Sequence, residues 1–192
     1  MPWATLLLLH GTGGDENDML GIGEHLAPGA NLLSPRGRVL ENGMPRFFRR
    51  FKDGTFDYGD LKFQTFALLD FVRSAAEEYA FDPGRVVAVG YSNGANIATS
   101  ILLHNPFELK AAVLFRPIVP FTPIIPLKLD GKHVLISAGT EDHIATNRET
   151  RALEKILKDL DGDVTLNWTE AGHELIPEDI EVGKMWLERY VH

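Results

Sequence analysis

The sequence predicts an α/β protein in which a mainly parallel sheet of about six strands lies between two layers of helices. Short apolar runs alternate with stretches of helical periodicity along most of the chain, which is the pattern of βαβ units. The apolar runs are too short for buried helices and end at turn residues. With 192 residues, 44% of them hydrophobic and 24% charged, the chain has the size and composition of a single globular domain, which we expect to span residues 1–192.

The strands are predicted from short apolar runs that end at glycine, proline or polar residues. The clearest run, RVVAVG, is rich in β-branched residues and follows the turn sequence Asp82-Pro83-Gly84. The first run stops at a cluster of glycines after His10. The predicted strands are residues 4–10, 30–34, 85–90, 111–115, 133–137 and 164–168.

The helices are predicted from apolar stripes at helical spacing and from end signals. Residues 61–79 place their leucines and valine on one stripe, and a stripe of leucines and Ile156 ends before Gly162. Pro177 suits a first helical position, and the acids that follow it complement the positive end of a helix. The predicted helices are 15–26, 61–79, 93–104, 147–160 and a last one that begins at Pro177.

Two segments do not fit this alternation. Residues 36–60 are too long and mixed for a simple connection, and such loops are usually functional or mobile. In residues 117–130, Pro117, Pro120, Pro123 and Pro126 recur at every third position, which excludes a helix and favours an extended path. Both segments could instead be structural covers at the sheet edge.

Composition excludes several classes of function. The absence of cysteine rules out a thiol nucleophile, a thiolate zinc site and an iron–sulfur cluster. The net charge of −8 disfavours nucleic acid as a partner. No apolar run approaches the roughly 20 residues of a membrane span, so we expect no integral membrane association. The early apolar run also lacks the basic flank of a signal peptide, and we expect a cytoplasmic protein. A homodimer is left open.

The sequence Gly90-Tyr91-Ser92-Asn93-Gly94 matches the G-x-S-x-G pattern of a nucleophile turn. It lies between a valine-rich predicted strand and a predicted helix, where such a turn must lie. A serine on this tight turn needs neighbours without side-chain bulk, which the two glycines provide. The following helix directs N–H groups at a developing oxyanion. Simple helix capping by Ser92 is the alternative, but it does not explain the pair of glycines. Ser92 is therefore our candidate nucleophile.

The loops after the last two predicted strands supply the partners that a serine nucleophile requires. Asp142 follows the strand at 133–137, and His173 follows the strand at 164–168, in the chain order Ser, Asp, His. We predict His173 as the general base and Asp142 as the acid that orients it. Glu141 is an alternative acid and His143 an alternative base, although His143 breaks the chain order. A metal site is disfavoured because no H-E-x-x-H spacing is present.

The glycine-rich loop at 10–18 has two interpretations. A dinucleotide-binding loop would need glycine at the position of Glu16, and its acids would repel a pyrophosphate. The alternative is half of an oxyanion hole, with the backbone N–H groups of Thr12 and Asn93 as the donors. In that interpretation the acids of the loop cap the following helix.

These motifs together resemble the phospholipase/carboxylesterase family of small bacterial α/β hydrolases, relatives of acyl-protein thioesterases. The strings that carry the resemblance are LLLHGTGGDEND, LSPRGRVLENGMPRFFRRF, FDPGRVVAVGYSNGAN, VLFRPIVP, LISAGTEDHI and AGHEL. The resemblance implies a three-layer α/β-hydrolase fold lacking the two leading strands, with the first strand between the second and third. It also implies ester hydrolysis by Ser92, Asp142 and His173. His143 departs from the proline that many relatives have after the acid.

We expect the two irregular segments to line the substrate site. The predicted substrate-binding residues are Gly13, Phe48, Arg49, Phe115, Pro117 and Ile144. Apolar surface is also expected from Met44, Phe47, Phe51, Ile118 and Pro120. Arg46, Arg49 and Arg50 have two interpretations: they bind an anionic ester, or they pair with the acidic excess of the chain, which we favour.

The sequence therefore predicts a serine esterase that acts on small or short-acyl carboxylic esters without a cofactor. Thioesters and lysophospholipids are alternative substrates for the same site. A non-catalytic small-molecule binder on a hydrolase scaffold is a second hypothesis. A flavodoxin-like phosphate or nucleotide binder is a third, disfavoured by the acidic glycine loop. Labelling of Ser92 by a fluorophosphonate separates the first hypothesis from the others.

Overall fold

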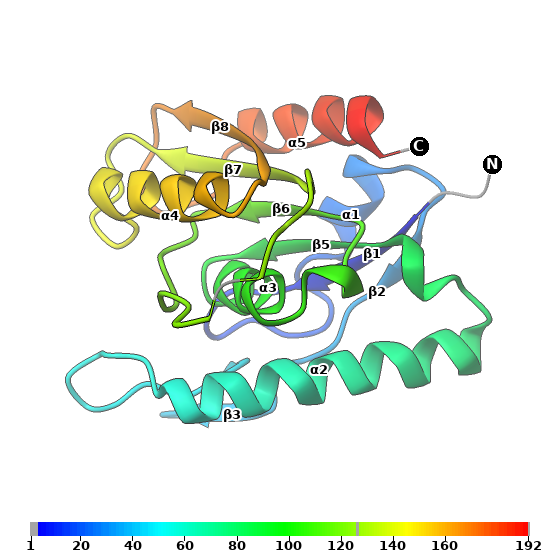
Figure 1. Cartoon of the computed structure of the whole chain (residues 1–192), viewed down its shortest axis with the longest axis horizontal. Coiled ribbons are helices and arrows are strands. Elements are labelled where there is room, and N and C mark those ends of the chain that lie inside the picture. The colour runs from blue at the N-terminus through cyan, green and yellow to red at the C-terminus, as the bar shows by residue number, and fades with distance from the viewer. Residues whose placement is uncertain (1–3, 126, 192) are drawn as a thin grey trace.

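A parallel six-stranded sheet forms the centre of the protein (Figure 1). The structure is a computed structural model, and it describes residues 4–125 and 127–191. The strand order is β2-β1-β5-β6-β7-β8, and every pair of neighbours is parallel. The first strand therefore lies between the second and third predicted strands, as expected. The strands are β1 (Thr5–Leu9), β2 (Asn31–Leu33), β5 (Val86–Tyr91), β6 (Ala111–Phe115), β7 (His133–Gly139) and β8 (Asp163–Thr169).

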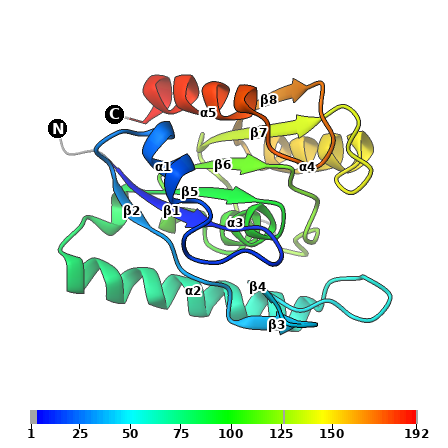
Figure 2. The ribbon, with the colours of Figure 1, turned by 180° about the vertical axis from the view of Figure 1, so that it is seen from behind.

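Helices cover both faces of the sheet, as Figures 1 and 2 show from opposite sides. One core cluster joins the sheet to α2, α3 and α4, and a second joins its other face to α1 and α5. The three-layer α/β fold is thus confirmed. The helices are α1 (Leu20–Leu26), α2 (Tyr58–Tyr79), α3 (Asn93–His104), α4 (Asn147–Asp159) and α5 (Pro177–Tyr190).

Strand β1, which has a neighbour on each side, shows why the apolar runs are continuous rather than alternating. Leu7 and Leu9 pack into the core with α2, α3 and α4, whereas Leu6 and Leu8 pack into the core with α1 and α5. A strand buried on both faces needs apolar side chains at every position. The periodicity of such a strand therefore indicates burial but does not show which face each residue takes.

The strand register brings four loops to one edge of the sheet. Leu9 pairs with Gly90, Tyr91 with Phe115, and Gly139 with Thr169. The glycine loop, the Ser92 turn, the acid loop and the histidine loop each follow one of these strands. Parallel sheets bind ligands at their carboxyl edge, where the strand order reverses, and that reversal occurs at β1.

The segment at 36–60 contains a hairpin that the sequence analysis did not predict. Strands β3 (Val39–Glu41) and β4 (Met44–Arg46) pair antiparallel around Asn42 and Gly43, both of which have positive φ. Asn-Gly between two short strands is the usual signal of a two-residue hairpin loop. Short 3₁₀ turns also occur at Pro83–Arg85 and Pro106–Glu108.

Two further expectations have clear outcomes. The described part of residues 117–130 contains no helix or strand, in agreement with its prolines, although Pro126 lies outside the described residues. Helix α1 was predicted from residue 15 but begins at Leu20. The acids before it do not cap the helix: Asp15 accepts the N–H of Asn17, and Asp18 accepts the N–H of Asp15.

Within residues 4–125 and 127–191, no helix has both the length and the apolar character of a membrane span.

Candidate active site

Ser92 lies on a strained turn between β5 and α3. Its backbone has φ +52° and ψ −113°, a combination that costs energy for any residue with a side chain. A Cβ on Gly90 would meet the backbone of Gly94, and a Cβ on Gly94 would meet the carbonyl oxygens of Leu9 and His10. Both glycines of the motif are thus required by close backbone contacts, and the turn presents Ser92 at the carboxyl edge of the sheet.

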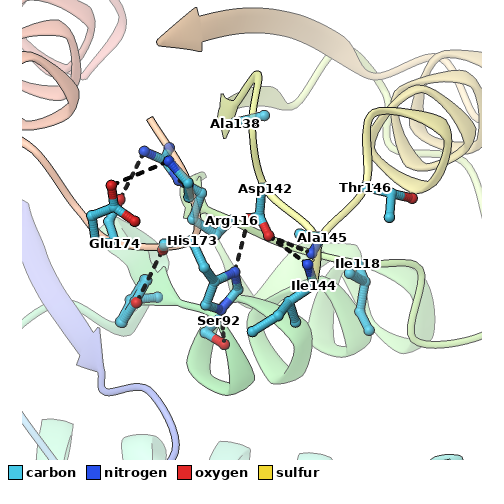
Figure 3. Close-up of polar contacts among 12 residues, drawn as sticks. Ser92, Arg116, Ile118, Ala138, Asp142, Ile144, Ala145, Thr146, His173 and Glu174 are labelled. Atoms are coloured by element: carbon cyan, nitrogen blue, oxygen red, sulfur yellow. Dashed lines mark hydrogen bonds and ion pairs between the residues drawn. The ribbon is translucent and has the colours of Figure 1, made fainter. Parts of the chain in front are cut away.

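A chain of hydrogen bonds joins Ser92 to His173 and Asp142 (Figure 3). The imidazole Nε2 lies 2.8 Å from the Ser92 hydroxyl, and Nδ1 lies 2.8 Å from Oδ2 of Asp142. The other carboxylate oxygen of Asp142 accepts the amides of Ile144 at 2.7 Å and Ala145 at 2.8 Å. These contacts fit a neutral imidazole that donates from Nδ1 and accepts the serine proton at Nε2.

The alternative acid and base do not join this chain. Glu141 and His143 are exposed, and neither hydrogen-bonds to Ser92 or His173 in the part of the chain that the structure describes. The Asp142 side chain is completely buried, whereas His173 is partly exposed and so accessible to a substrate. Among the described residues, no group of three histidines or carboxylates could hold a metal ion.

The glycine loop lies beside the serine. A Cβ built on Gly11 would lie 3.7 Å from the Ser92 Cβ. The N–H groups of Thr12 and Asn93, the two predicted oxyanion donors, make no hydrogen bond within the described residues. Both are therefore free to bind a substrate oxygen. Gly13 has φ +84°, a conformation that favours glycine.

The hairpin β3–β4 and the residue after it hold these donors in place. The carbonyl of Pro45 accepts the N–H of Gly13 at 2.9 Å, and the Arg46 guanidinium donates to the Thr12 hydroxyl at 2.6 Å. On the serine side, the N–H of Phe47 donates to the side-chain oxygen of Asn93 at 2.7 Å. The irregular segment thus supports both sides of the predicted oxyanion site, a role that the sequence analysis missed.

Arg46, Arg49 and Arg50, the arginines with two interpretations, all have carboxylate partners. Buried Arg46 lies 3.2 Å from Glu41, Arg50 pairs with the same carboxylate, and Arg49 lies 3.5 Å from Asp57. Burial, with a smaller effect of the neighbouring Arg50, lowers the pKa of Arg46 to about 10, so its guanidinium stays charged at neutral pH. This pairing agrees with the interpretation in which the arginines balance acidic residues.

Some predicted substrate-binding residues are not accessible, and these predictions were wrong. Phe48 and Phe115 are 0% exposed. Phe48 packs edge-on against Phe56 in one core, and Phe115 lies in the other core. Pro117 is buried as well. An apolar residue near a strand end is more often core than pocket, and this outweighed their place in the sequence.

Other predicted substrate-binding residues do face solvent. Gly13 and Arg49 are exposed, and Ile144 is 62% exposed. Figure 3 draws Ile144 next to the imidazole of His173, on the loop that also carries Asp142. Ile144 therefore presents apolar surface to solvent beside His173.

A cavity of about 280 Å³ adjoins the glycine loop. Its wall includes Gly11 and Thr12 of the glycine loop, Tyr91, and the acidic residues Asp18 and Glu174. Hydrogen bonds from the backbone hold the pKa of the Glu174 carboxyl below its ordinary value, so it is ionised at neutral pH. The remaining wall residues are Gly14, Met19, Ile22 and Leu175. The cavity therefore combines apolar surface with negative charge.

Comparison with known proteins places this arrangement in a family. Residues 58–182 match the dienelactone hydrolase family. The chain is 46% identical over 186 residues to "Putative hydrolase MhqD" of Bacillus subtilis (strain 168), covering 97% of this chain and 93% of that protein.

Two solved structures are also similar. The Bacillus cereus carboxylesterase is 47% identical with a TM-score of 0.95, and the match covers 98% of this chain and 89% of that one. The protein Atu2452 of unknown function from Agrobacterium tumefaciens str. C58 is 41% identical with a TM-score of 0.89, and the match covers 99% of this chain and 93% of that one. The resemblance to small α/β hydrolases is confirmed, and this chain is a hydrolase that belongs to the dienelactone hydrolase family.

Proposed function

We propose that the protein is a serine hydrolase that cleaves carboxylic esters through an acyl-enzyme. The observation that carries the proposal is the chain of hydrogen bonds from Ser92 through His173 to Asp142, with each contact at 2.8 Å. This is the arrangement that makes a serine hydroxyl nucleophilic. The similarity to a Bacillus cereus carboxylesterase supports an ester as the substrate.

The reaction follows from the geometry. Ser92 Oγ attacks the ester carbonyl while His173 Nε2 takes its proton, and Asp142 stabilises the imidazolium that forms. The N–H groups of Thr12 and Asn93 bind the oxyanion. The C–O bond then breaks, His173 protonates the departing alcohol, and water cleaves the acyl-enzyme by the same steps in reverse order.

The surroundings of the serine favour a small substrate. The cavity that adjoins the glycine loop is about 280 Å³, and Ile144 and Met44 are exposed apolar side chains near it, which together offer little surface for a long acyl chain. A short-acyl ester fits better than a lysophospholipid. A thioester of similar size is the second candidate, because the same attack on the carbonyl cleaves it.

Hydrolysis of 4-nitrophenyl esters from acetate to decanoate tests the proposal. We expect kcat/KM to be highest for the short chains. Ser92→Ala should lower kcat by at least about 10⁴-fold, because it removes the nucleophile. Its circular dichroism and unfolding midpoint should match those of the native protein.

Two outcomes would contradict the proposal. A folded Ser92→Ala variant with native activity excludes the serine mechanism. A folded native protein that hydrolyses none of the esters, and whose serine takes no fluorophosphonate, favours the non-catalytic binding scaffold instead.

A further inference from the structure

Two side chains hold the backbone of the loop that carries His173. The carbonyl of Gly172 accepts from Arg116 Nε at 3.0 Å, that of His173 from the Tyr91 hydroxyl at 3.0 Å, and that of Glu174 from Arg116 Nη2 at 2.9 Å. These three successive carbonyls lie between β8 and α5, outside helix and strand. Figure 3 shows Arg116 beside this loop and the bond from its guanidinium to Glu174.

Arg116 itself is buried and fixed. Its guanidinium pairs with both oxygens of Asp179, at 2.8 Å and 2.7 Å, and neither side chain is exposed. Asp179 lies in the first turn of α5 and also accepts from Ser137 Oγ at 2.7 Å and the amide of Ile176 at 3.0 Å. A buried ion pair is weak evidence for stability, because removing both charges from water costs about as much as their attraction returns. The ion pair alone therefore does not explain why the guanidinium is buried. The guanidinium also donates to the carbonyls of Gly172 and Glu174.

The backbone at Arg116 is strained as well. Its φ is +53°, in the left-handed region that residues with a side chain rarely adopt. Strain of this kind is retained where the surrounding structure requires it, and it clusters at functional sites. The strained position turns the chain at the end of β6, next to the serine turn.

Both side chains come from the serine side of the site. Tyr91 immediately precedes Ser92, and Arg116 immediately follows Phe115, whose carbonyl accepts the Ser92 N–H at 2.9 Å. The nucleophile and the loop of His173 are therefore joined by the same two side chains. Burial raises the pKa of the Tyr91 phenol, so its hydroxyl stays protonated and continues to donate well above neutral pH.

We propose that Arg116 and Tyr91 are positioning residues that set the distance between the His173 imidazole and Ser92. The inference rests on the proposed serine mechanism. A loop that carries a base outside regular structure can shift by an ångström at little cost, and such a displacement can lower a rate about 10²-fold. Holding three consecutive carbonyls removes this freedom.

Tyr91→Phe is the sharpest test, because it removes one hydroxyl and leaves the ring in place. We expect kcat for a short-acyl 4-nitrophenyl ester to fall about 10-fold while KM changes less than twofold. The acid limb of the kcat–pH profile should also move, because the imidazole changes its surroundings. The matched control is Tyr58→Phe, whose hydroxyl contacts His104 at 3.4 Å outside the triad, and it should leave kcat and the profile unchanged.

Arg116→Lys is the second variant. Lysine keeps the charge opposite Asp179 but cannot reach two carbonyls with a planar fork, so we expect a fall in kcat of about 100-fold. If this variant fails to fold, the Tyr91→Phe result alone decides whether the positioning role holds.

The outcomes separate positioning from a purely structural role. A structural role predicts a lower unfolding midpoint with native kcat and an unchanged pH profile, and a folded Tyr91→Phe variant with native kcat and profile overturns the inference. If Ser92→Ala abolishes turnover in the same assay, only the inference has failed. If Ser92→Ala keeps native turnover, the proposed function itself has failed.

Discussion

At the scale of single residues, the two oxygens of Asp142 have separate roles. Oδ1 accepts two backbone amides of its own loop, and this fixes the direction in which Oδ2 faces the imidazole. A carboxylate held in this way selects the imidazole tautomer with its proton on Nδ1. Nε2 is then free to accept the proton of Ser92.

Asp142→Asn tests this role. An amide can place an N–H opposite Nδ1, which forces the wrong tautomer, and we expect kcat to fall about 10⁴-fold with the fold retained. Steady-state kinetics with a short-acyl ester measure the change. The control is Glu141→Gln on the same loop, which should stay within twofold of the native enzyme. The reverse result, with activity lost only in the Glu141 variant, would transfer the acid role to Glu141.

Sequence reasoning was most successful for residues whose chemistry and place in the chain agree. Ser92, Asp142 and His173 each follow a predicted strand, and the structure brings all three together. It was least successful for Phe48 and Phe115, because a phenylalanine has the same sequence signature in a core and in a pocket. The role of Arg46 could not be predicted either, since its contact with Thr12 depends on a hairpin that joins distant parts of the chain.

At the scale of elements, the hairpin β3–β4 supports the glycine-rich loop that carries the proposed oxyanion donor Thr12. It contributes a backbone carbonyl to Gly13 and a guanidinium to Thr12, and so fixes a glycine-rich loop that has few side chains of its own to pack. An oxyanion donor must be held within a few tenths of an ångström of its position, because its effect depends on preorganisation.

Arg46→Met tests the support that the hairpin gives. We expect kcat to fall about 10-fold with KM nearly unchanged, because the Thr12 amide becomes less well placed for the transition state. Arg50→Met is the control: it removes an ion pair to the same Glu41 without touching Thr12 and should leave kcat within twofold. Equal losses in both variants would show that the Glu41 ion pairs matter rather than the contact with Thr12.

Elements were predictable where one rule governed the segment. The short apolar runs predicted the strands of the six-stranded sheet, and the stripe at 61–79 predicted most of α2, which begins at Tyr58. Helix α1 was predicted too early because its acids close local turns, and acids serve turns as well as helix starts. The hairpin was predictable from Asn42-Gly43, but the flanking strands are only three residues long and show no alternation.

At the scale of the whole molecule, we expect charge to favour neutral substrates. The chain carries a net charge of −8, and the cavity beside the glycine loop has Asp18 and Glu174 in its wall. Arg46, Arg49 and Arg50, the arginines considered for binding an anionic ester, are all paired with carboxylates.

A pair of esters with equal chain length measures this preference. We expect kcat/KM for 4-nitrophenyl butyrate to exceed that for 4-nitrophenyl hemisuccinate at least about 5-fold at low ionic strength. The ratio of the two kcat/KM values should fall in 0.5 M salt, because the Debye length is then about 4 Å and the charges are screened. Glu174→Gln should narrow it too, and the exposed Glu77→Gln on α2 serves as the control. A preference for the anionic ester would favour the interpretation in which an arginine binds substrate.

The ion pair that joins α5 to the sheet makes stability depend on pH. Burial alone would raise the pKa of the Asp179 carboxyl, but hydrogen bonds from Arg116, the Ile176 amide and Ser137 outweigh it and hold the pKa below its ordinary value. The charged Asp179 carboxylate therefore stabilises the fold fully above about pH 4, the ordinary pKa of an aspartate. This stabilisation is lost as the pH falls further.

Urea denaturation between pH 3 and pH 7 tests whether the charged Asp179 carboxylate stabilises the fold. Asp179→Asn should lower the free energy of unfolding by about 3–5 kcal/mol at pH 7, because it leaves the Arg116 charge buried without its partner. The gap between native protein and variant should narrow below about pH 4. Asp159→Asn, in an exposed ion pair with Lys155, is the control and should change stability by less than about 1 kcal/mol. A gap that stays constant down to pH 3 would show that the Asp179 carboxylate does not stabilise the fold by being charged.

Covalent labelling tests the central claim most directly. The folded protein is treated with a fluorophosphonate at neutral pH, and the adduct is located by peptide mass spectrometry. We predict a single adduct on Ser92, absent from Ser92→Ala and formed at least about 100-fold more slowly in His173→Ala, because only an activated serine reacts at a useful rate. An adduct on another residue, or equal labelling of the native protein and the His173 variant, would contradict the serine mechanism.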